Sequence, residues 1–492
     1  MSELTKLTYD QLREGYLSGK FLPSDVVKAY LQRMAACEEL NAYITPLPDH
    51  AMAQANDADI RVKKGDMRPL EGFPLAVKDL FCTQNILTTA ASHILHNFTP
   101  FYESTITERL SHAGTILLGK TNMDEFAMGS STENSAYGPC ESPWRNKATP
   151  TKPLSPGGSS GGSSCAVAAR MALGALGSDT GGSIRQPASF TGLVGLKPTY
   201  GRCSRYGMIA FASSFDQAGP LTRTVKDTVH LFEHMSGYDP RDSTTAMLPR
   251  FSLKESLEKP LIKLKVGIPK EYKISAHHPE AMDAWHDTIK WIRSEAATIE
   301  EVSLPHSEYS LPTYYIIAPA EASSNLQRYD GIRYGLRLGD KNIDEIYEKT
   351  RSEGFGDEVQ RRIVVGTFVL SSGAYEDYYL RGLQVRRLIR NEYKKVLKEV
   401  DVLLTPTTPT PPFALGEKIS NPMEMYLSDI LTVGANLAGL PAISVPVGLS
   451  KQGLPIGMQF TGFDFQEELL FRIAHQLEQF TQFPSRILSE VI

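Results

Sequence analysis

The sequence predicts an α/β fold in which helices cover both faces of a large, mixed and mostly parallel central sheet. Four short apolar runs, partly β-branched and bounded by glycine or proline, are typical of buried strands: 73–77, 115–118, 402–404 and 442–447. Segments with helical periodicity alternate with these runs. The 492 residues, 41% of them apolar, are sufficient to bury a large core.

Three segments carry clear helical patterns. Pro23, Ser24 and Asp25 are typical of a helix start, and apolar side chains recur behind them at helical spacing. The same spacing in 282–292 and 470–477 predicts amphipathic helices packed on the core. Patterns are mainly helical, without strand-like alternation, from about residue 275 to about 400, and we expect a cap over the sheet there.

The chain contains no linker that would divide it into independent parts. We therefore predict one domain over residues 1–492. Its core is expected at about 60–240 and 400–480, and its mainly helical cap at about 275–400.

Composition argues against several classes of protein. A net charge of −5 lacks the positive excess expected of a nucleic-acid binder, so any RNA would be held by another chain. Five cysteines, an odd number without Cys-x-x-Cys spacing, argue against a disulfide framework or a zinc site, and a reducing cytoplasm fits best. The first residues hold no apolar signal core, and no apolar run reaches membrane-spanning length. We expect a soluble protein without metal or membrane contacts.

Two loops rich in glycine and serine lie close together, at 157–164 and 177–185. Glycine lets backbone N–H groups turn toward a ligand and serine supplies a nucleophile, so the pair indicates covalent catalysis with an oxyanion hole. Flexible linkers are the alternative interpretation. The segment between the loops, 165–173, is a strong helix former without linker character, which favours catalysis.

The first loop also matches the G-x-S-x-G nucleophile elbow of α/β-hydrolases at 157–161. Such an elbow follows a hydrophobic strand. The preceding segment, 147–156, contains three prolines, which remove donors from a strand ladder. The context therefore argues against an elbow.

A literal phosphate-loop pattern occurs at 114–121. A working phosphate loop curls its N–H groups around the ligand, whereas the internal Thr-Ile-Leu-Leu is typical of a buried strand. We interpret this match as a coincidence.

Lys78 is the candidate general base. None of the eleven histidines lies between His112 and His230, so no imidazole neighbours the serine loops in the sequence. An apolar setting disfavours a charged ammonium and allows a neutral lysine to act as base. Lys78 ends the apolar run 73–77 and precedes Asp79, at a strand terminus where α/β active sites gather. A solvated surface charge is the alternative interpretation.

In combination, the segments 73–79, 157–164 and 177–187 resemble the amidase signature family. The similarity continues through 321–331, 370–373 and 436–446. Over this wider pattern, the chain resembles the glutamine-hydrolysing subunits of tRNA-dependent amidotransferases. It covers nearly the whole chain. The segment between Trp144 and Gly157 is longer than the family pattern by about six residues, within the range that loops tolerate.

This resemblance implies a Ser-Ser-Lys triad. Ser183 would be the nucleophile, Ser159 a bridging serine in a cis peptide, and Lys78 the base. Lys78 would take a proton from Ser159, and Ser159 would take one from Ser183. The oxyanion would be held by backbone N–H groups of four consecutive residues: Thr180, Gly181, Gly182 and Ser183.

The resemblance also implies a glutamine site. Asp429 would bind the substrate ammonium and Arg362 its carboxylate, with Tyr314 nearby. From the residues alone, the neighbours Arg361 and Tyr315 remain alternatives for these roles.

The activity implied by resemblance is that of a cytoplasmic glutaminase subunit without a cofactor of its own. Ammonia would pass to a partner subunit that converts Glu-tRNA(Gln) to Gln-tRNA(Gln) with ATP and magnesium and holds most of the tRNA. A small third subunit is also implied. A stand-alone amidase and a non-catalytic scaffold with the same fold are the alternatives.

Overall fold

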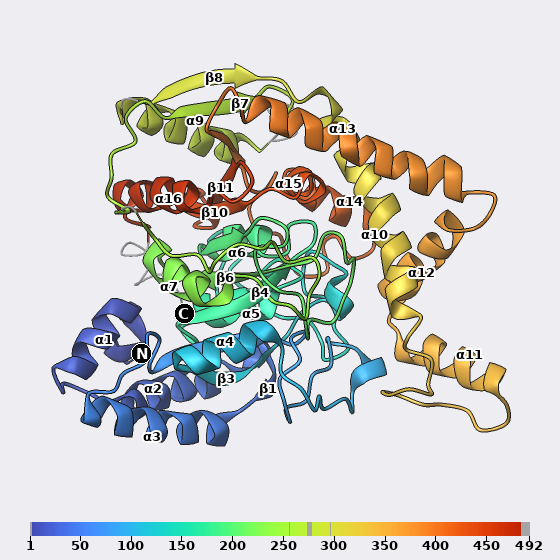
Figure 1. The fold of residues 1–492 in the computed structure, drawn as a ribbon, viewed down its shortest axis with the longest axis horizontal. Coiled ribbons are helices and arrows are strands. Elements are labelled where there is room, and N and C mark those ends of the chain that lie inside the picture. Colours follow the sequence, from blue (N-terminus) through green and yellow to red (C-terminus); the bar gives the residue numbers. More distant parts are fainter. Residues whose placement is uncertain (1, 255, 273–277, 296, 484–492) are drawn as a thin grey trace.

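The computed structural model describes residues 2–254, 256–272, 278–295 and 297–483, and within them one sheet of eleven strands organises the chain (Figure 1). In order of position across the sheet, the strands are β1 (Tyr43–Pro46), β3 (Thr115–Thr121), β2 (Phe73–Lys78), β4 (Gly174–Asp179), β6 (Gln217–Thr222), β5 (Val194–Lys197), β10 (Ala442–Leu449), β11 (Pro455–Gly462), β9 (Val402–Pro406), β7 (Lys265–Pro269) and β8 (Thr298–Val302). The four strands predicted from apolar runs are β2, β3, β9 and β10, and each is confirmed.

Strand direction is mixed, as predicted, but the expectation of a mostly parallel sheet is wrong. Within the described residues, β2 pairs in parallel with β3 and β4, and β7 with β8 and β9. The other six pairings are antiparallel. The reason is topological, because β6 inserts antiparallel between β4 and β5, and β10 and β11 form a hairpin. Continuous apolar runs show that a strand is buried on both faces, which is typical of parallel sheets but is found here in β10, whose two pairings are antiparallel.

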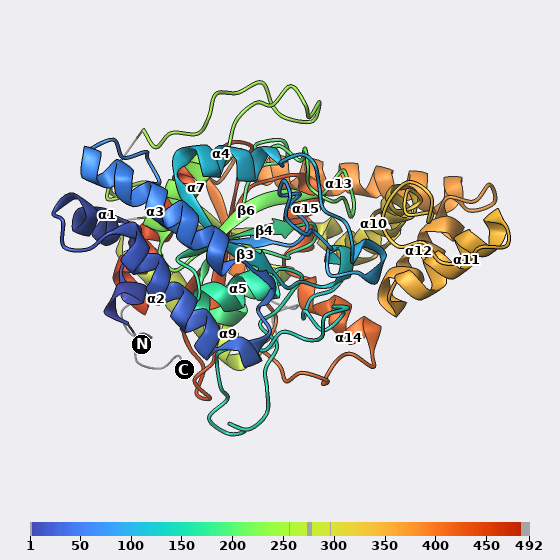
Figure 2. The same cartoon turned by 90° about the horizontal axis from the view of Figure 1, so that it is seen from below.

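Helices cover both faces of the sheet, as predicted. In Figure 2, α4 (Thr105–Ala113) and α7 (Val225–Met235) lie on one side of β3, β4 and β6, and α5 (Gly161–Ala168) lies on the other. The remaining helices around the sheet are α1 (Tyr9–Leu17), α2 (Pro23–Ala36), α3 (Pro48–Lys64), α6 (Arg185–Thr191), α9 (Pro279–Ser294), α14 (Pro422–Tyr426), α15 (Val433–Ala438) and α16 (Glu467–Thr481). The predicted helices at residue 23, at 282–292 and at 470–477 correspond to α2, α9 and α16.

Short helical segments occur between these elements and in the cap described below. They are η1 (Glu3–Lys6), η2 (Glu38–Leu40), η3 (His93–Leu95), η4 (Glu125–Ala127), η5 (Pro305–Tyr309), η6 (Tyr375–Leu380) and η7 (Leu427–Asp429). Two of them, η4 and η7, begin or end at residues that bear on the site described below.

Four helices extend from the sheet as a cap at the right of Figure 1: α10 (Ser310–Leu326), α11 (Ile343–Gly354), α12 (Asp357–Val369) and α13 (Arg381–Val396). The mainly helical pattern from 275 to 400 did not reveal β8, which lies in this range and forms the edge of the sheet beside β7. Residues of β8 are half-buried or exposed, so the strand lacks the apolar run that marks a buried one.

The phosphate-loop match lies on β3, as the strand interpretation requires. Lys120 is fully buried, donates to the Phe81 carbonyl at 2.9 Å and the Thr88 hydroxyl at 2.7 Å, and pairs with Asp79 at 3.3 Å. Its ammonium thus has protein partners and serves the fold.

Two further observations test the predictions made from the cysteine count and from the absence of long apolar runs. All five cysteines are free and buried. Among the helices of the described ranges, none has the length and apolar character needed to cross a membrane.

Candidate active site

Lys78 ends β2 in a fully buried position and contacts three serine hydroxyls. The distances from Lys78 Nζ to the Oγ atoms of Ser159, Ser160 and Ser178 are each 2.8 Å. The parallel pairing of β2 with β4 carries the second glycine-serine loop to this strand end, and the contacts with Ser159 and Ser160 place the first loop there too. The alternative of a solvated surface lysine is therefore wrong.

Burial sets the protonation state of Lys78. Removal from water lowers the pKa of the Lys78 amine from 10.5 to about 7, against the opposing influence of the carboxylates of Asp124, Asp179 and Asp216. A neutral amine donates two hydrogen bonds and accepts one. The Ser160 hydroxyl donates to the Ser178 carbonyl at 3.2 Å, so its oxygen is available to accept from Lys78. When Lys78 is neutral, the lone pair of its nitrogen lies within hydrogen-bond distance of the Ser159 hydroxyl, from which it can accept a proton.

The peptide bond between Gly158 and Ser159 is cis, as the resemblance implied. Several contacts hold this bond in place. Gly158 N donates to Gln186 Oε1 at 2.9 Å, and the Ser159 carbonyl accepts from Asp124 N at 3.3 Å. A Cβ at Gly158 would overlap Asp124 Oδ2, so only glycine fits here.

Ser183 lies in the loop that connects β4 to α6, and its carbonyl accepts from Ser160 N at 3.3 Å. This contact places Ser183 beside Ser160, the residue that follows Ser159. Within the part of the chain that the structure describes, the N–H groups of Gly181, Gly182 and Ser183 donate no hydrogen bond. Such unpaired donors are the feature that an oxyanion hole requires.

Buried charges brace this loop at both ends. Arg185 and Asp179 pair at 3.0 Å, and Asn436 Nδ2 donates to Asp179 Oδ1 at 2.8 Å. The Thr180 hydroxyl donates to Asp216 Oδ1 at 2.7 Å. The loop is therefore held rigidly from both β4 and the segment that precedes β6.

Tyr314 and Asp429 border the same loop. A Cβ placed on Gly181 would lie 2.9 Å from Tyr314 Oη, and one on Gly182 would lie 3.3 Å from Asp429 Oδ1. Burial raises the pKa of Asp429 to about 7, while the Ser130 hydroxyl, which donates to its carboxylate, and the Arg362 charge act in the opposite direction. Tyr314 and Asp429 thus face the backbone that leads to Ser183.

Arg362 is buried in the cap among aromatic rings. Its guanidinium carbon lies 5.3 to 5.5 Å from the ring centres of Phe211, Tyr315 and Tyr426. Arg362 Nε donates to Glu358 Oε1 at 2.8 Å. The neighbouring Arg361 pairs with the same glutamate, but its side chain is 47% exposed, against 5% for Arg362. Arg362 is therefore the arginine that faces the interior, and Tyr315 packs against it.

Comparison with known proteins shows the family of this chain. The sequence model of the family described as Amidase matches residues 25–471. The chain belongs to the amidase family. It is 53% identical to the A subunit of the glutamyl-tRNA(Gln) amidotransferase of Parvibaculum lavamentivorans over 98% of both chains.

Solved structures of several amidase-family proteins share the fold. The A subunit of the glutamyl-tRNA(Gln) amidotransferase of Thermotoga maritima has a TM-score of 0.77 and 38% identity, covering 97% of this chain and 96% of that one. The native peptide amidase of Stenotrophomonas maltophilia has a TM-score of 0.80 and 28% identity, covering 96% and 97%.

Sequence reasoning on this amidase missed several residues of the site. Ser160 and Ser178 complete the contacts of Lys78, Asp124 holds the cis peptide, and Glu358 holds Arg362. Ser160 and Ser178 lie within the two glycine-serine loops, so the loop pattern contained them. Glu358 lies four residues before Arg362 on α12, so the i,i+4 spacing of the two charges was a local signal. Asp124 had no local signal, because its contact with Ser159 is made across the fold.

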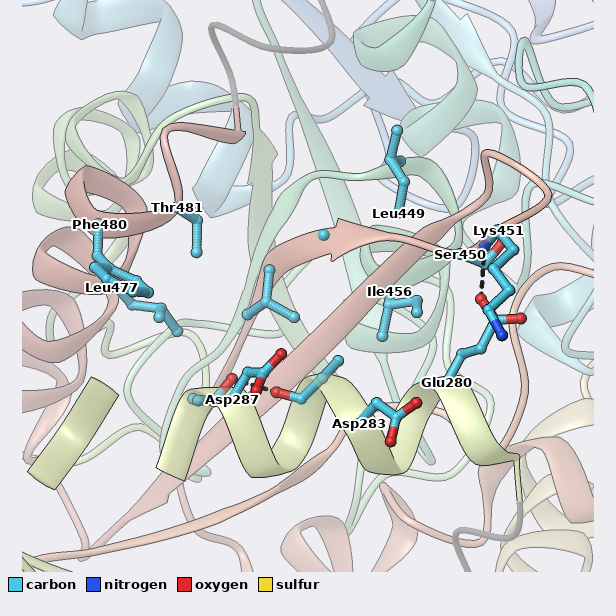
Figure 3. Close-up of a pocket in the computed structure, with 14 residues that line it drawn as sticks. Glu280, Asp283, Asp287, Leu449, Ser450, Lys451, Ile456, Leu477, Phe480 and Thr481 are labelled. Carbon is cyan, nitrogen blue, oxygen red and sulfur yellow. Dashed lines mark hydrogen bonds between the residues drawn. The ribbon is translucent and has the colours of Figure 1, made fainter. Parts of the chain in front are cut away.

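A separate pocket of about 370 Å³ lies between α9, α16 and the hairpin of β10 and β11 (Figure 3). Glu280, Asp283 and Asp287 border one side, and Leu449 and Ile456 lie opposite. None of the predicted site residues of this amidase lines the pocket. It is distinct from the candidate active site.

Proposed function

We propose that this amidase is the glutamine-hydrolysing subunit of a tRNA-dependent amidotransferase. The observation that carries the proposal is the buried Lys78, with a pKa of about 7, at 2.8 Å from Ser159 and beside the loop of Ser183. The high identity, over the full length, to the A subunit of a glutamyl-tRNA(Gln) amidotransferase supports the same role.

In the proposed acylation step, Ser183 attacks the side-chain amide carbon of glutamine. Neutral Lys78 accepts the proton of Ser159 while Ser159 accepts that of Ser183. The new Oγ–C bond forms a tetrahedral oxyanion, which accepts hydrogen bonds from the N–H groups of 180–183. Collapse breaks the C–N bond, and the proton returns through Ser159 to the leaving nitrogen, so ammonia departs.

Deacylation reverses the relay with water as the nucleophile. Water loses a proton to the relay and forms a C–O bond with the glutamyl ester. The ester C–O bond then breaks, Ser183 regains its proton, and glutamate leaves. The overall balance is glutamine and water to glutamate and ammonia.

In this proposal two side chains bind the charged groups of glutamine, and a third closes the site. The Arg362 guanidinium pairs with the substrate carboxylate. Asp429, ionised when a substrate ammonium stands beside it, binds that ammonium. Tyr314 packs over Gly181 and closes the site near the scissile amide.

The proposal assigns the second reaction to a partner. This chain supplies ammonia and carries no cofactor, and a partner subunit uses ATP and magnesium to convert Glu-tRNA(Gln) to Gln-tRNA(Gln). That partner holds most of the tRNA, in keeping with the net charge of −5 on this chain. A small third subunit completes the cytoplasmic complex.

The test is Gln-tRNA formation from glutamine by the complete complex containing Ser183→Ala. We expect glutamine-dependent product to fall to background while added ammonia still supports it. Unchanged glutamine-dependent synthesis would refute the proposal. A stand-alone amidase would instead release ammonia from glutamine at the same rate with or without the partner subunits, tRNA and ATP.

A further inference from the structure

Glu125 is a buried carboxylate that joins the catalytic core to the cap. It lies in η4, directly after Asp124, which contacts the Ser159 carbonyl. One of its oxygens accepts from the Ser92 hydroxyl, and the other accepts from Gly356 N at 2.8 Å. The contact with Gly356 spans 231 positions of the sequence. None of the steps proposed above uses this side chain.

The second contact lies at the start of α12, the helix that carries Arg362. Gly356 is the residue before its first turn and has no side chain to accept from the helix N–H groups. A Cβ on Gly356 would lie 2.5 Å from Glu125 Oε2, so the carboxylate occupies the space of the missing side chain. Glu125 thus caps α12 from a distant part of the chain.

An aromatic contact reinforces the same junction. The ring of Phe126 lies 5.1 Å from that of Tyr329 and 5.7 Å from that of Phe355, measured between centres. The Ser92 Oγ also lies 3.3 Å from the Gly354 carbonyl oxygen. Core and cap therefore meet through polar and apolar contacts at 354–356.

The junction lies close to Arg362, the residue of α12 proposed to bind the substrate carboxylate. Arg362 follows Gly356 by six residues, which corresponds to about 9 Å along a helix. A shift at the start of α12 therefore moves Arg362 nearly as a rigid body. Bidentate pairing with a carboxylate tolerates little displacement.

We propose that Glu125 is a positioning residue that acts through α12 to hold Arg362 at the distance required for binding the substrate carboxylate. The proposal rests on the glutaminase function above. It makes Glu125 a determinant of glutamine selectivity, since amides without an α-carboxylate make no use of Arg362.

The experiment measures kcat and KM for glutamine and for a simple aliphatic amide without carboxylate or ammonium, using the complete complex. Glu125→Ala is expected to raise KM for glutamine at least tenfold, with a much smaller change in kcat. Its loss of kcat/KM with glutamine should exceed its loss with the simple amide at least tenfold. Glu125→Gln keeps an acceptor oxygen for Gly356 N and should fall between wild type and Glu125→Ala.

The matched control is Glu71→Ala. Glu71 is another buried glutamate of the core, paired with Arg68 at 2.7 Å. Its loss should not change the ratio of kcat/KM between the two substrates. Amide hydrogen exchange adds a direct readout, because Glu125→Ala should speed exchange at 356–360 and leave β4 unchanged.

Equal losses with both substrates, or unchanged exchange at the start of α12, would overturn the inference. In an Arg362→Ala background, a full additional loss from Glu125→Ala would do the same, because residues that act through one another are not additive. Failure of the proposed function has a different signature in the wild-type protein, which would then either leave glutamine unhydrolysed or hydrolyse it at the same rate with and without the partner subunits, tRNA and ATP.

Discussion

The pKa of Lys78 leads to a quantitative prediction for the pH dependence of catalysis. An ordinary lysine with a pKa of 10.5 is about 0.03% neutral at pH 7, whereas one with a pKa of about 7 is about half neutral. Burial thus increases the population of the base about a thousandfold. We expect log kcat/KM to rise with pH with a slope of one below about pH 7 and to level off above about pH 8.

The assay uses a simple amide without an ammonium group, so that the ionisation of Asp429 does not contribute to the profile. Lys78→Arg places a permanently charged group at the same position and should lower kcat/KM about a thousandfold or more. Lys197 provides the control, because burial also lowers the pKa of its amine to about 7. Lys197→Met should retain the midpoint of the wild-type profile.

Two results would refute the reasoning. One is a wild-type profile that is flat through pH 7 or has its midpoint near pH 10. The other is retention of more than a tenth of the activity by Lys78→Arg, since a permanent cation cannot accept the Ser159 proton.

Three further predictions concern other parts of the site. Arg362→Lys should raise KM for glutamine at least tenfold, because lysine lacks the planar guanidinium that pairs with a carboxylate. Arg361→Lys changes an exposed side chain and should leave KM unchanged. Steady-state kinetics of both variants tests this, and equal effects would contradict the assignment. Asp429→Asn should raise KM for glutamine more than tenfold without a comparable effect on a simple amide, and a proportional loss with both substrates would argue against a contact with the ammonium. Gly158→Ala should lower the free energy of unfolding in urea by about 3 kcal/mol or more, because a Cβ at this position has no space. Gly373→Ala, where nothing lies within 4 Å of the added Cβ, should change it by about 0.5 kcal/mol at most. Similar changes in the two variants would show that the backbone at Gly158 adjusts freely.

Sequence patterns identified the components of this amidase where the information is local. Apolar runs located β2, β3, β9 and β10 because a buried strand needs consecutive apolar residues. They missed the other seven described strands, among them β4, which is rich in glycine, and β8, which lies half-exposed at the edge. The glycine-serine loops indicated catalysis, and the resemblance to the amidase family supplied the roles of individual residues.

Tertiary structure alone decided how these components meet. Lys78 lies 81 residues from Ser159 and 100 from Ser178, and only folding, with the pairing of β2 and β4, buries it beside both serines. The choice between Arg361 and Arg362 depends on the face that α12 turns toward the core, and the contact of Glu125 with Gly356 depends on how the cap docks. The amino-acid sequence by itself therefore determined which groups are available for chemistry. Burial, charge and contact between distant segments, which arise only on folding, determined their pKa values and their partners.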